Sequence, residues 1–354
     1  MKGLKLDPQQ IREELSLFRR QLEQSCRTLE SIDTAAVGTT PREQIFSNDN
    51  TRLYYYPPTT AVSLQTPVLI CYALVNRPYI ADLQPDRSLI AELGQRGVPV
   101  YLIDWGYPEA ADRFLDLEDY IDDYLHSCVD ASCQHAGSQQ LNLLGICQGG
   151  TFSLCYAALY PERVKNLILM VTPVDFHSEG FILSHLAMKL DIDLAVDTYG
   201  NIPGVLLNDS YHSLMPMRSG LQKHLNLPNT LGSREQALNF LRMEQWLNDT
   251  PDQAGEAFRS FTKQFCQQNL LLKGQVQIGR QRVDLRRIRQ PILNVIGRYD
   301  HLVPPASSRA LKQATASTDY QELEVKAGHI GVFVSRRGIR TVPQGISDWL
   351  QTRD

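Results

Sequence analysis

The sequence predicts an α/β fold in which helices cover both faces of a mostly parallel, doubly wound sheet, with a large helical insertion late in the chain. Three observations support this prediction. Continuous apolar runs, typical of buried parallel strands, alternate with helical patterns along most of the chain. A cysteine between glycines directly follows one of these runs and precedes a helix. The alternation stops after residue 176 and resumes at residue 291.

The first expected element is a helix over residues 9–32, where apolar residues recur every three or four positions among charged ones. Its apolar stripe consists of Ile11, Leu15, Phe18, Leu22, Cys26 and Leu29. A helix of this kind packs on its own domain or docks on a partner, and the sequence leaves both interpretations open.

Apolar segments bounded by turn residues have the length and composition of strands. They span residues 52–56, 68–74, 98–104, 141–144, 164–172, 291–296 and 320–325. Helical patterns lie between them, at residues 86–95, 117–135, 150–160 and 307–316. Because strands and helices alternate, consecutive strands are expected to run parallel.

Composition excludes several classes of protein. The chain has 354 residues, 43% of them hydrophobic and 21% charged, which suits one large or two medium globular domains. A net charge of -4 gives no electrostatic reason to expect nucleic acid binding. The longest apolar run, residues 68–75, is too short to span a membrane, and no signal peptide is recognised at the start. We therefore expect no nucleic acid partner and no membrane span.

The cysteines indicate the compartment. There are seven, an odd number scattered along the chain, which indicates free thiols in a reducing cytoplasm. Cys128 and Cys133 lie on one expected helix, but no further pair follows at zinc-binding spacing, so we interpret them as packing residues. We expect neither a metal nor a cofactor.

Residues 145–149 read Gly-Ile-Cys-Gln-Gly, the pattern of a hydrolase nucleophile elbow with Cys147 in place of serine. The expected strand before it and helix after it are the context that this motif requires. An elbow holds its nucleophile at positive φ and packs strand against helix, which leaves room only for glycine on either side. The sequence therefore predicts an α/β-hydrolase fold. An acyl group on cysteine remains an activated thioester, so this nucleophile favours acyl transfer over hydrolysis.

A thiol at its free pKa is only slightly ionised at neutral pH, so the nucleophile needs a base, and the N-terminus of the elbow helix favours its thiolate. The fold delivers nucleophile, acid and histidine in that order along the chain. Cys147, Asp300 and His329 satisfy this order, and the latter two follow the last two expected strands. His301 is a rival base, but adjacent side chains diverge in a tight turn, so we favour His329. Asp104 is a rival acid that we interpret as structural.

The oxyanion hole is expected to combine the backbone N–H of Gln148 with one from the loop after residues 68–74, at Val75 or Asn76. Asn76 is also a candidate substrate-binding residue. The alternative is that Asn76-Arg77-Pro78 forms a plain turn that Asn76 caps.

Residues 177–285 contain few strand-like segments and much helical and aromatic sequence. An insertion at this place is where a hydrolase-type fold carries a cap over its site. We expect four parts in the chain. They are an N-terminal helical segment at 1–40, the first part of the core at 41–176, a mainly helical cap subdomain at 177–285 and the second part of the core at 286–354.

At this point the chain resembles a known family, the polyhydroxyalkanoate synthases. The matching segments are residues 72–79, 101–106, 145–150, 171–176, 200–204, 251–255, 299–305 and 328–331. The resemblance runs from about residue 40 to the C-terminus. Because the chain is short and lacks a large N-terminal domain, it resembles the catalytic subunit of the type III form, which works with a second, non-catalytic subunit.

The resemblance implies an acyltransferase that polymerises (R)-3-hydroxyacyl-CoA, with 3-hydroxybutyryl-CoA as the expected substrate, and releases CoA. It implies that Cys147 accepts the acyl group, that His329 raises the nucleophilicity of the thiol, and that Asp300 helps to deprotonate the 3-hydroxyl of the incoming monomer or chain. It also implies a homodimer, a cap that opens, and attachment to the growing polyester at the surface of cytoplasmic granules.

Two alternatives remain open. One is a cysteine-dependent thioesterase or hydrolase of the same fold, which would release free hydroxyacid. The other is a non-catalytic granule-surface protein in which Cys147 is a packing residue, as free cysteines often are.

Overall fold

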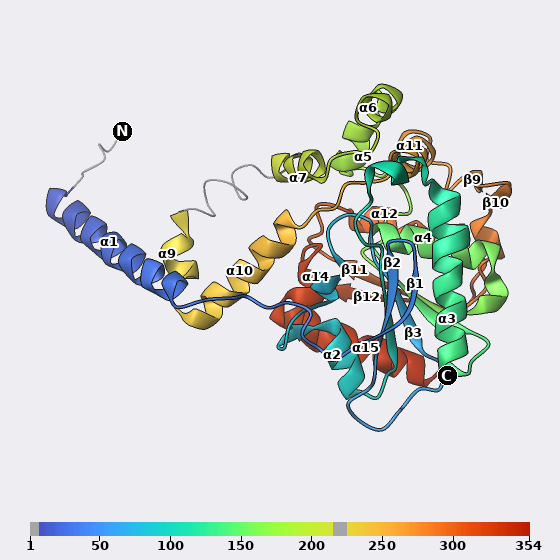
Figure 1. The fold of residues 1–354 in the computed structure, drawn as a ribbon, viewed down its shortest axis with the longest axis horizontal. Coiled ribbons are helices and arrows are strands. Elements are labelled where there is room, and N and C mark those ends of the chain that lie inside the picture. Colours follow the sequence, from blue (N-terminus) through green and yellow to red (C-terminus); the bar gives the residue numbers. More distant parts are fainter. Residues whose placement is uncertain (1–6, 215–224) are drawn as a thin grey trace.

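The computed structural model describes residues 7–214 and 225–354. Its centre is an eight-stranded sheet with the strand order β1-β2-β6-β3-β7-β8-β11-β12 (Figure 1). The strands are β1 Glu43–Asn48, β2 Thr51–Tyr56, β3 Val68–Cys71, β6 Val100–Asp104, β7 Leu141–Ile146, β8 Val164–Met170, β11 Ile292–Gly297 and β12 Tyr320–Val325. Strand β2 pairs antiparallel with both neighbours, and all pairs from β6 to β12 are parallel. The predicted mostly parallel sheet is therefore confirmed.

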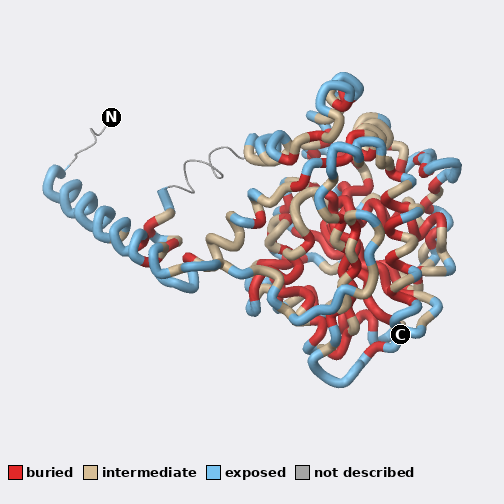
Figure 2. Tube along the Cα trace, viewed as in Figure 1, coloured by how far each residue is buried: buried red, intermediate tan, exposed pale blue. Residues whose placement is uncertain are grey.

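The central strands carry unbroken apolar sequence because both of their faces are covered. Every residue of β3, β7 and β11 is buried, whereas the edge strand β12 buries only its last residue. Helices α3 and α4 pack into the buried cluster on one face, and α2 and α15 pack into the cluster on the other. Figure 2 shows this buried core concentrated in and around the sheet.

The helices of the core alternate with the strands as the sequence predicts. They are α2 Leu89–Gln95, α3 His126–Ala136, α4 Gln148–Leu159, α12 Pro305–Arg309, α13 Leu311–Ala314, α14 Gly331–Val334 and α15 Arg336–Gln351. A π-helical segment, η3 Asp119–Leu125, precedes α3 and forms the first part of the helix predicted at 117–135. In the described ranges, no helix is both long enough and apolar enough to cross a membrane.

The segment between β8 and β11 is mainly helical. Its described helices are α5 Ile182–Ala187, α6 Ile192–Tyr199, α7 Gly204–Ser213, α9 Leu227–Thr230, α10 Arg234–Asn248 and α11 Gly255–Phe261, with a π-helical turn, η6 Thr262–Gln267, after them. A short hairpin follows, made of β9 Val276–Ile278 and β10 Gln281–Val283. We call residues 177–285 the insert. In Figure 1, α5, α6, α7 and α11 lie at one end of the sheet.

The N-terminal helix α1, Pro8–Glu30, extends away from the sheet and lies along α9 and the start of α10 (Figure 1). Near its C-terminal end, the Ser25 hydroxyl donates to the Pro228 carbonyl over 3.3 Å. Five members of the apolar stripe are exposed, namely Ile11 at 37%, Leu15 at 63%, Phe18 at 42%, Leu22 at 44% and Cys26. Packing of the whole stripe on its own domain is therefore wrong. Among the described residues, α1 contacts α9 and α10 of the insert near its C-terminal end.

Several elements differ from prediction for identifiable reasons. The strand predicted at 68–74 ends at Cys71, because the Tyr72 carbonyl accepts a 2.8 Å hydrogen bond from the Trp105 indole instead of continuing the sheet. Strand β1 was not predicted, because none of its residues is buried and most of them are polar. Helix α15 was not predicted either, because it contains Pro343 and two glycines, which are poor helix formers. It nevertheless buries a long apolar face.

Candidate active site

Cys147 lies in the sharp turn between β7 and α4, with φ 54° and ψ -123°. A non-glycine residue rarely adopts this conformation, and the surrounding packing must impose it. A Cβ atom on Gly145 would lie 2.4 Å from the Cα of Gly150, and one on Gly149 would lie 2.2 Å from the Cys71 carbonyl oxygen. Glycine is therefore required at both positions. The predicted elbow geometry is present.

The elbow sets Cys147 apart from most of the other cysteines. Its side chain is half-buried, whereas Cys71, Cys128, Cys133 and Cys155 are buried in the core. Burial raises the pKa of the Cys71 thiol to about 12, so this thiol stays protonated. Cys147 stands at the N-terminus of α4, where the positive end of the helix dipole faces it.

Asp300 and His329 form a buried pair in the loops that follow β11 and β12. The Nδ1 atom of His329 lies 2.7 Å from Oδ2 of Asp300, and the two residues are only 6% and 7% exposed. The other carboxylate oxygen accepts 2.9 Å hydrogen bonds from the backbone N–H groups of Leu302 and Val303. Both carboxylate oxygens are thus engaged, which fixes the orientation of the carboxylate and of the ring.

His329 also lies beside Cys147, because both residues line the same two cavities and Cys147 acts on the pKa of the ring, so the structure brings all three predicted residues together. Burial disfavours the charged ring, but the carboxylate of Asp300 and the thiolate of Cys147 outweigh burial and raise the pKa of His329. A ring with a raised pKa readily holds the proton that it takes from the nucleophile, and the Asp300 carboxylate stabilises the charged ring from behind.

The two rivals occupy other positions. Asp104 forms an ion pair with Arg77 at 2.7 Å and accepts a 3.0 Å hydrogen bond from the Gly106 N–H. Asp104 therefore stabilises the loop that follows β6 and has a structural role. His301 lies on the wall of one of the cavities at Cys147, but Asp300 is hydrogen-bonded to His329.

The expected oxyanion residues flank Cys147. Gln148 and Val75 line one cavity together with Cys147, and the Gln148 side chain accepts a 3.0 Å hydrogen bond from the Leu74 N–H. This bond ties the 74–76 loop to the elbow. The use of the Gln148 and Val75 amides as an oxyanion hole stays a prediction.

Asn76 has a structural task that the sequence did not reveal. It adopts φ 58°, and its amide nitrogen donates to the Trp246 carbonyl over 3.1 Å and to the Thr250 hydroxyl over 2.8 Å. These bonds fasten the end of α10 to the core. Asn76 also lines a cavity at Cys147, and its contact with substrate stays a prediction.

Two cavities open at Cys147 and His329. The first, which we call the Trp246 cavity, has a volume of about 360 Å³ and is lined by Trp246, Asn76 and His301 among others. The second, which we call the phenylalanine cavity, has a volume of about 470 Å³. Its walls include Phe176, Phe181, Phe258 and Phe261. Space is therefore available in two cavities beside the nucleophile.

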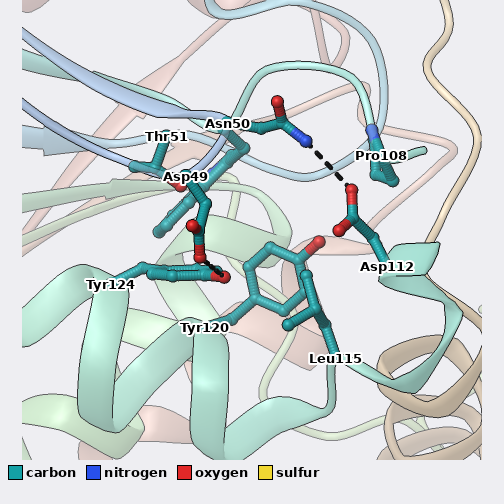
Figure 3. Close-up of a pocket in the computed structure, with 9 residues that line it drawn as sticks. Asp49, Asn50, Thr51, Pro108, Asp112, Leu115, Tyr120 and Tyr124 are labelled. Atoms are coloured by element: carbon teal, nitrogen blue, oxygen red, sulfur yellow. Dashed lines mark hydrogen bonds between the residues drawn. The ribbon is translucent and has the colours of Figure 1, made fainter.

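A third cavity lies near the β1–β2 turn and is shown in Figure 3. Asn50 donates to Asp112 and Tyr124 donates to Asp49, each over 2.9 Å. The volume is only about 10 Å³, which holds no more than a single water. We assign it no ligand. Across residues 7–214 and 225–354, no group of three or more His, Cys, Asp or Glu side chains is placed to hold a metal ion.

Two tyrosines that the sequence did not indicate lie beside the nucleophile, in the wall of the Trp246 cavity. Burial and the nearby Cys147 thiolate raise the pKa values of Tyr72 and Tyr211. Tyr72 comes from the loop after β3, and Tyr211 comes from α7 of the insert. No local pattern marks Tyr211, because only the folding of the insert brings it to the elbow.

Comparison with known proteins defines the class first. Residues 66–335 match the family described as alpha/beta hydrolase fold. A monoacylglycerol lipase from Paleococcus ferrophilus superposes with a TM-score of 0.51 at 16% identity, covering 85% of this chain and 99% of the lipase. A thermophilic esterase from Thermogutta terrifontis gives 0.50 at 18% identity, covering 88% and 98%. The protein thus has the predicted α/β-hydrolase fold.

The sequence relatives define the family. Residues 11–93 match the family described as Poly-beta-hydroxybutyrate polymerase (PhaC) N-terminus. The chain is 47% identical over its full length to all of the poly(3-hydroxyalkanoate) polymerase subunit PhaC of Thiocystis violacea. It is 50% identical to that subunit of Synechocystis sp. over 91% of this chain and 87% of the relative. For Allochromatium vinosum the identity is 48% over 98% of both chains. The chain belongs to the PhaC family of poly(3-hydroxyalkanoate) polymerases, which confirms the resemblance.

Proposed function

We propose that this protein polymerises (R)-3-hydroxyacyl groups from CoA thioesters into polyhydroxyalkanoate and releases CoA. The observation that carries the proposal is the elbow cysteine, which lies beside a buried, hydrogen-bonded His329–Asp300 pair in a chain 47% identical to a polymerase subunit. The names of the relatives supply the substrate class, and the geometry supplies a mechanism.

In the loading step, the Cys147 sulfur attacks the thioester carbonyl and CoA leaves as its thiol. The His329 imidazole takes the cysteine proton and returns it to the CoA sulfur, so one thioester and one thiol are exchanged for another pair. We assign stabilisation of the oxyanion that forms between these states to the Gln148 and Val75 amides, and the presence of both residues in the wall of a cavity at Cys147 supports this.

In the elongation step, a 3-hydroxyl group attacks the thioester carbonyl on Cys147, a C–O ester bond forms as the C–S bond breaks, and Cys147 leaves as its thiol after it receives the hydroxyl proton through His329. The hydroxyl proton must pass to the His329–Asp300 pair. Because both Asp300 oxygens are engaged, we propose that the carboxylate acts chiefly by making His329 a stronger base. Direct removal of the hydroxyl proton by Asp300, which the family resemblance suggests, requires one of these bonds to break first.

Water competes with the hydroxyl group for the acyl enzyme, so the site must exclude it. Trp246 and Tyr211 of the insert line the cavities at Cys147, which supports a cap role for residues 177–285. We propose that the chain is organised as a helical segment at 1–40, a core at 41–176 and 286–354, and this cap. Polymer growth requires the cap to open.

We further propose that the chain is the catalytic subunit of a type III synthase. Three relatives are named as subunits, which supports a second subunit for this chain as well. A homodimer, and attachment to polyester granules in the cytoplasm, belong to the same proposal.

The test follows CoA and sedimentable polyester together while purified protein acts on (R)-3-hydroxybutyryl-CoA. Matched release of CoA and formation of insoluble polymer, both absent in Cys147→Ala, is the expected result. Release of CoA with only soluble hydroxyacid would instead identify a thioesterase. If the wild-type protein with its co-expressed second subunit releases no CoA, the proposal is overturned.

A further inference from the structure

The two cavities at the nucleophile adjoin each other and share part of their lining. Five described residues line both the Trp246 cavity and the phenylalanine cavity: Val75, Cys147, Tyr211, Leu302 and His329. We call these residues the neck. Any group attached to the Cys147 sulfur lies among their side chains before it reaches either cavity.

The neck combines the core with the insert. Val75, Cys147, Leu302 and His329 belong to core loops at the carboxyl ends of strands. Of the insert residues that the structure describes, Tyr211 alone lines both cavities. It is also the one aromatic ring in the neck besides the His329 imidazole. Its size therefore sets how much space remains beside the sulfur.

Helix α7 runs along the border between the cavities. Asn208 and His212 of this helix line the Trp246 cavity, whereas Leu207 and Ser210 line the phenylalanine cavity. Tyr211 lies between these two sets of side chains. Because the two sides of α7 face different cavities, the ring of Tyr211 lies where a partition between them must be.

Tyr211 lines both cavities together with Cys147, which places it beside the nucleophile. Burial is the main cause that raises the pKa of Tyr211, and the nearby Cys147 raises it further. The phenol therefore stays neutral and occupies space beside the sulfur without supplying charge. The loop residue Tyr72 faces the same sulfur and is affected by both Cys147 and Tyr211.

We propose that Tyr211 is a specificity-determining residue whose ring separates the two cavities beside Cys147 and limits the bulk that an acyl group can carry near the sulfur. As applied to hydroxyacyl substrates, the inference rests on the proposed function. A 3-hydroxyacyl thioester branches at the carbon that bears the hydroxyl, close to the thioester itself. The branch must therefore lie in the neck, where Tyr211 limits its size.

The first experiment compares loading by (R)-3-hydroxybutyryl-CoA and (R)-3-hydroxyhexanoyl-CoA, measured as the first turnover of CoA release. Added methylenes change kcat/KM by about 10- to 200-fold in a shaped apolar pocket. Tyr211→Ala is expected to raise the ratio of hexanoyl to butyryl kcat/KM by about 10-fold or more. Tyr211→Trp should lower this ratio, and Tyr211→Phe should leave it unchanged because the ring is kept.

A control variant separates selectivity from general damage. Val205 is on the same helix, is 68% exposed and lines neither cavity, so Val205→Ala should not alter the ratio. If Tyr211 were merely structural, its replacement would slow both substrates by the same factor. Equal slowing, or a ratio that stays constant from alanine to tryptophan, would overturn the inference.

A second experiment needs no acyl-CoA activity. Alkyl methanethiosulfonates react with a thiolate to form a mixed disulfide, and methanesulfinate leaves with the electron pair of the broken bond. Labelling rates of the Cys147 peptide with methyl and benzyl reagents are read by mass spectrometry, which excludes the exposed Cys26. Tyr211→Ala should raise the benzyl-to-methyl rate ratio about 10-fold, and Tyr211→Trp should lower it.

The two experiments distinguish failure of the function from failure of the inference. If the ratio of labelling rates changes as expected but no hydroxyacyl-CoA loads the wild-type enzyme, the proposed function fails and the role of Tyr211 stands. If the enzyme makes polymer and neither ratio changes, the role of Tyr211 is wrong. Should Tyr211→Ala fail to fold, Tyr211→Trp still decides, because it leaves no unfilled space.

Discussion

Replacement of Asp300 by asparagine should separate loading from elongation. The Leu302 and Val303 N–H groups both point at one oxygen of this side chain, so asparagine must keep its own oxygen there. Its NH2 group then faces Nδ1 of His329, which has to become an acceptor. The ring proton moves to the nitrogen that faces Cys147, and the imidazole can no longer accept a proton there.

The two steps differ in how much they need that base. A cysteine at its free pKa of about 8.5 is already a few per cent thiolate at pH 7, so losing all assistance costs loading at most roughly 30-fold. An aliphatic hydroxyl resembles water, whose pKa lies far above neutral pH, and is almost never ionised without a base. Elongation should therefore fall by about 10⁴-fold, the loss that the same change causes in a Ser-His-Asp triad.

Rapid-quench measurement of the first CoA released per enzyme gives loading, and steady-state CoA release with polymer mass gives elongation. Asp209→Asn provides a matched control, because this carboxylate is exposed on α7 and lines neither cavity. Equal losses in both steps would refute the reasoning, and so would rapid accumulation of long polymer by the Asp300→Asn enzyme.

Three further outcomes are expected. His329→Gln should slow elongation by about 10²- to 10⁴-fold and loading by at most roughly 30-fold, whereas His301→Gln should cost either step less than about 10-fold; equal losses in the two variants would reverse the choice of base. Because the pKa of His329 is raised on folding, its stabilisation is complete below about pH 6.5 and is lost as pH rises through the folded-state value. Urea titrations should therefore show the stability difference between wild type and His329→Gln shrinking at alkaline pH, and a difference that grows would contradict the sign. Asn76→Ala should lower the free energy of unfolding by about 1–3 kcal/mol, since it removes the bonds that hold α10, and unchanged denaturation would exclude that role.

The sequence predicted the elbow and its partners because their determinants are local or ordered along the chain. Gly145 is needed because of its contact with Gly150 in the elbow helix, and Gly149 because the Cys71 carbonyl of the neighbouring strand approaches it; the elbow motif includes both glycines and so predicts them. Asp300 and His329 follow successive strands, and parallel strands end at the same edge of the sheet. The chain order of this fold was therefore enough to choose them.

What the sequence could not predict depends on contacts between distant segments. The end of β3 is set by the Trp105 indole, which lies over thirty positions away. The position of Tyr211 depends on how α7 folds back over the elbow, and no periodicity in residues 177–285 specifies that. The exposure of the apolar stripe of α1 could not be predicted either, because a helical pattern indicates an apolar face but not what covers that face.

The elbow and the two cavities together explain why a hydrolase fold suits polymerisation. A hydrolase needs one acyl pocket and a path for water, whereas chain growth needs space for an acyl group on the nucleophile and for a second acyl group that attacks it. Cys147 lies where the Trp246 cavity and the phenylalanine cavity meet, so both groups can be present at once. Sulfur keeps the first group activated while the second arrives. Cysteine in place of serine and the pair of cavities therefore both serve the elongation step. Neither feature alone would let an ester bond form in preference to hydrolysis.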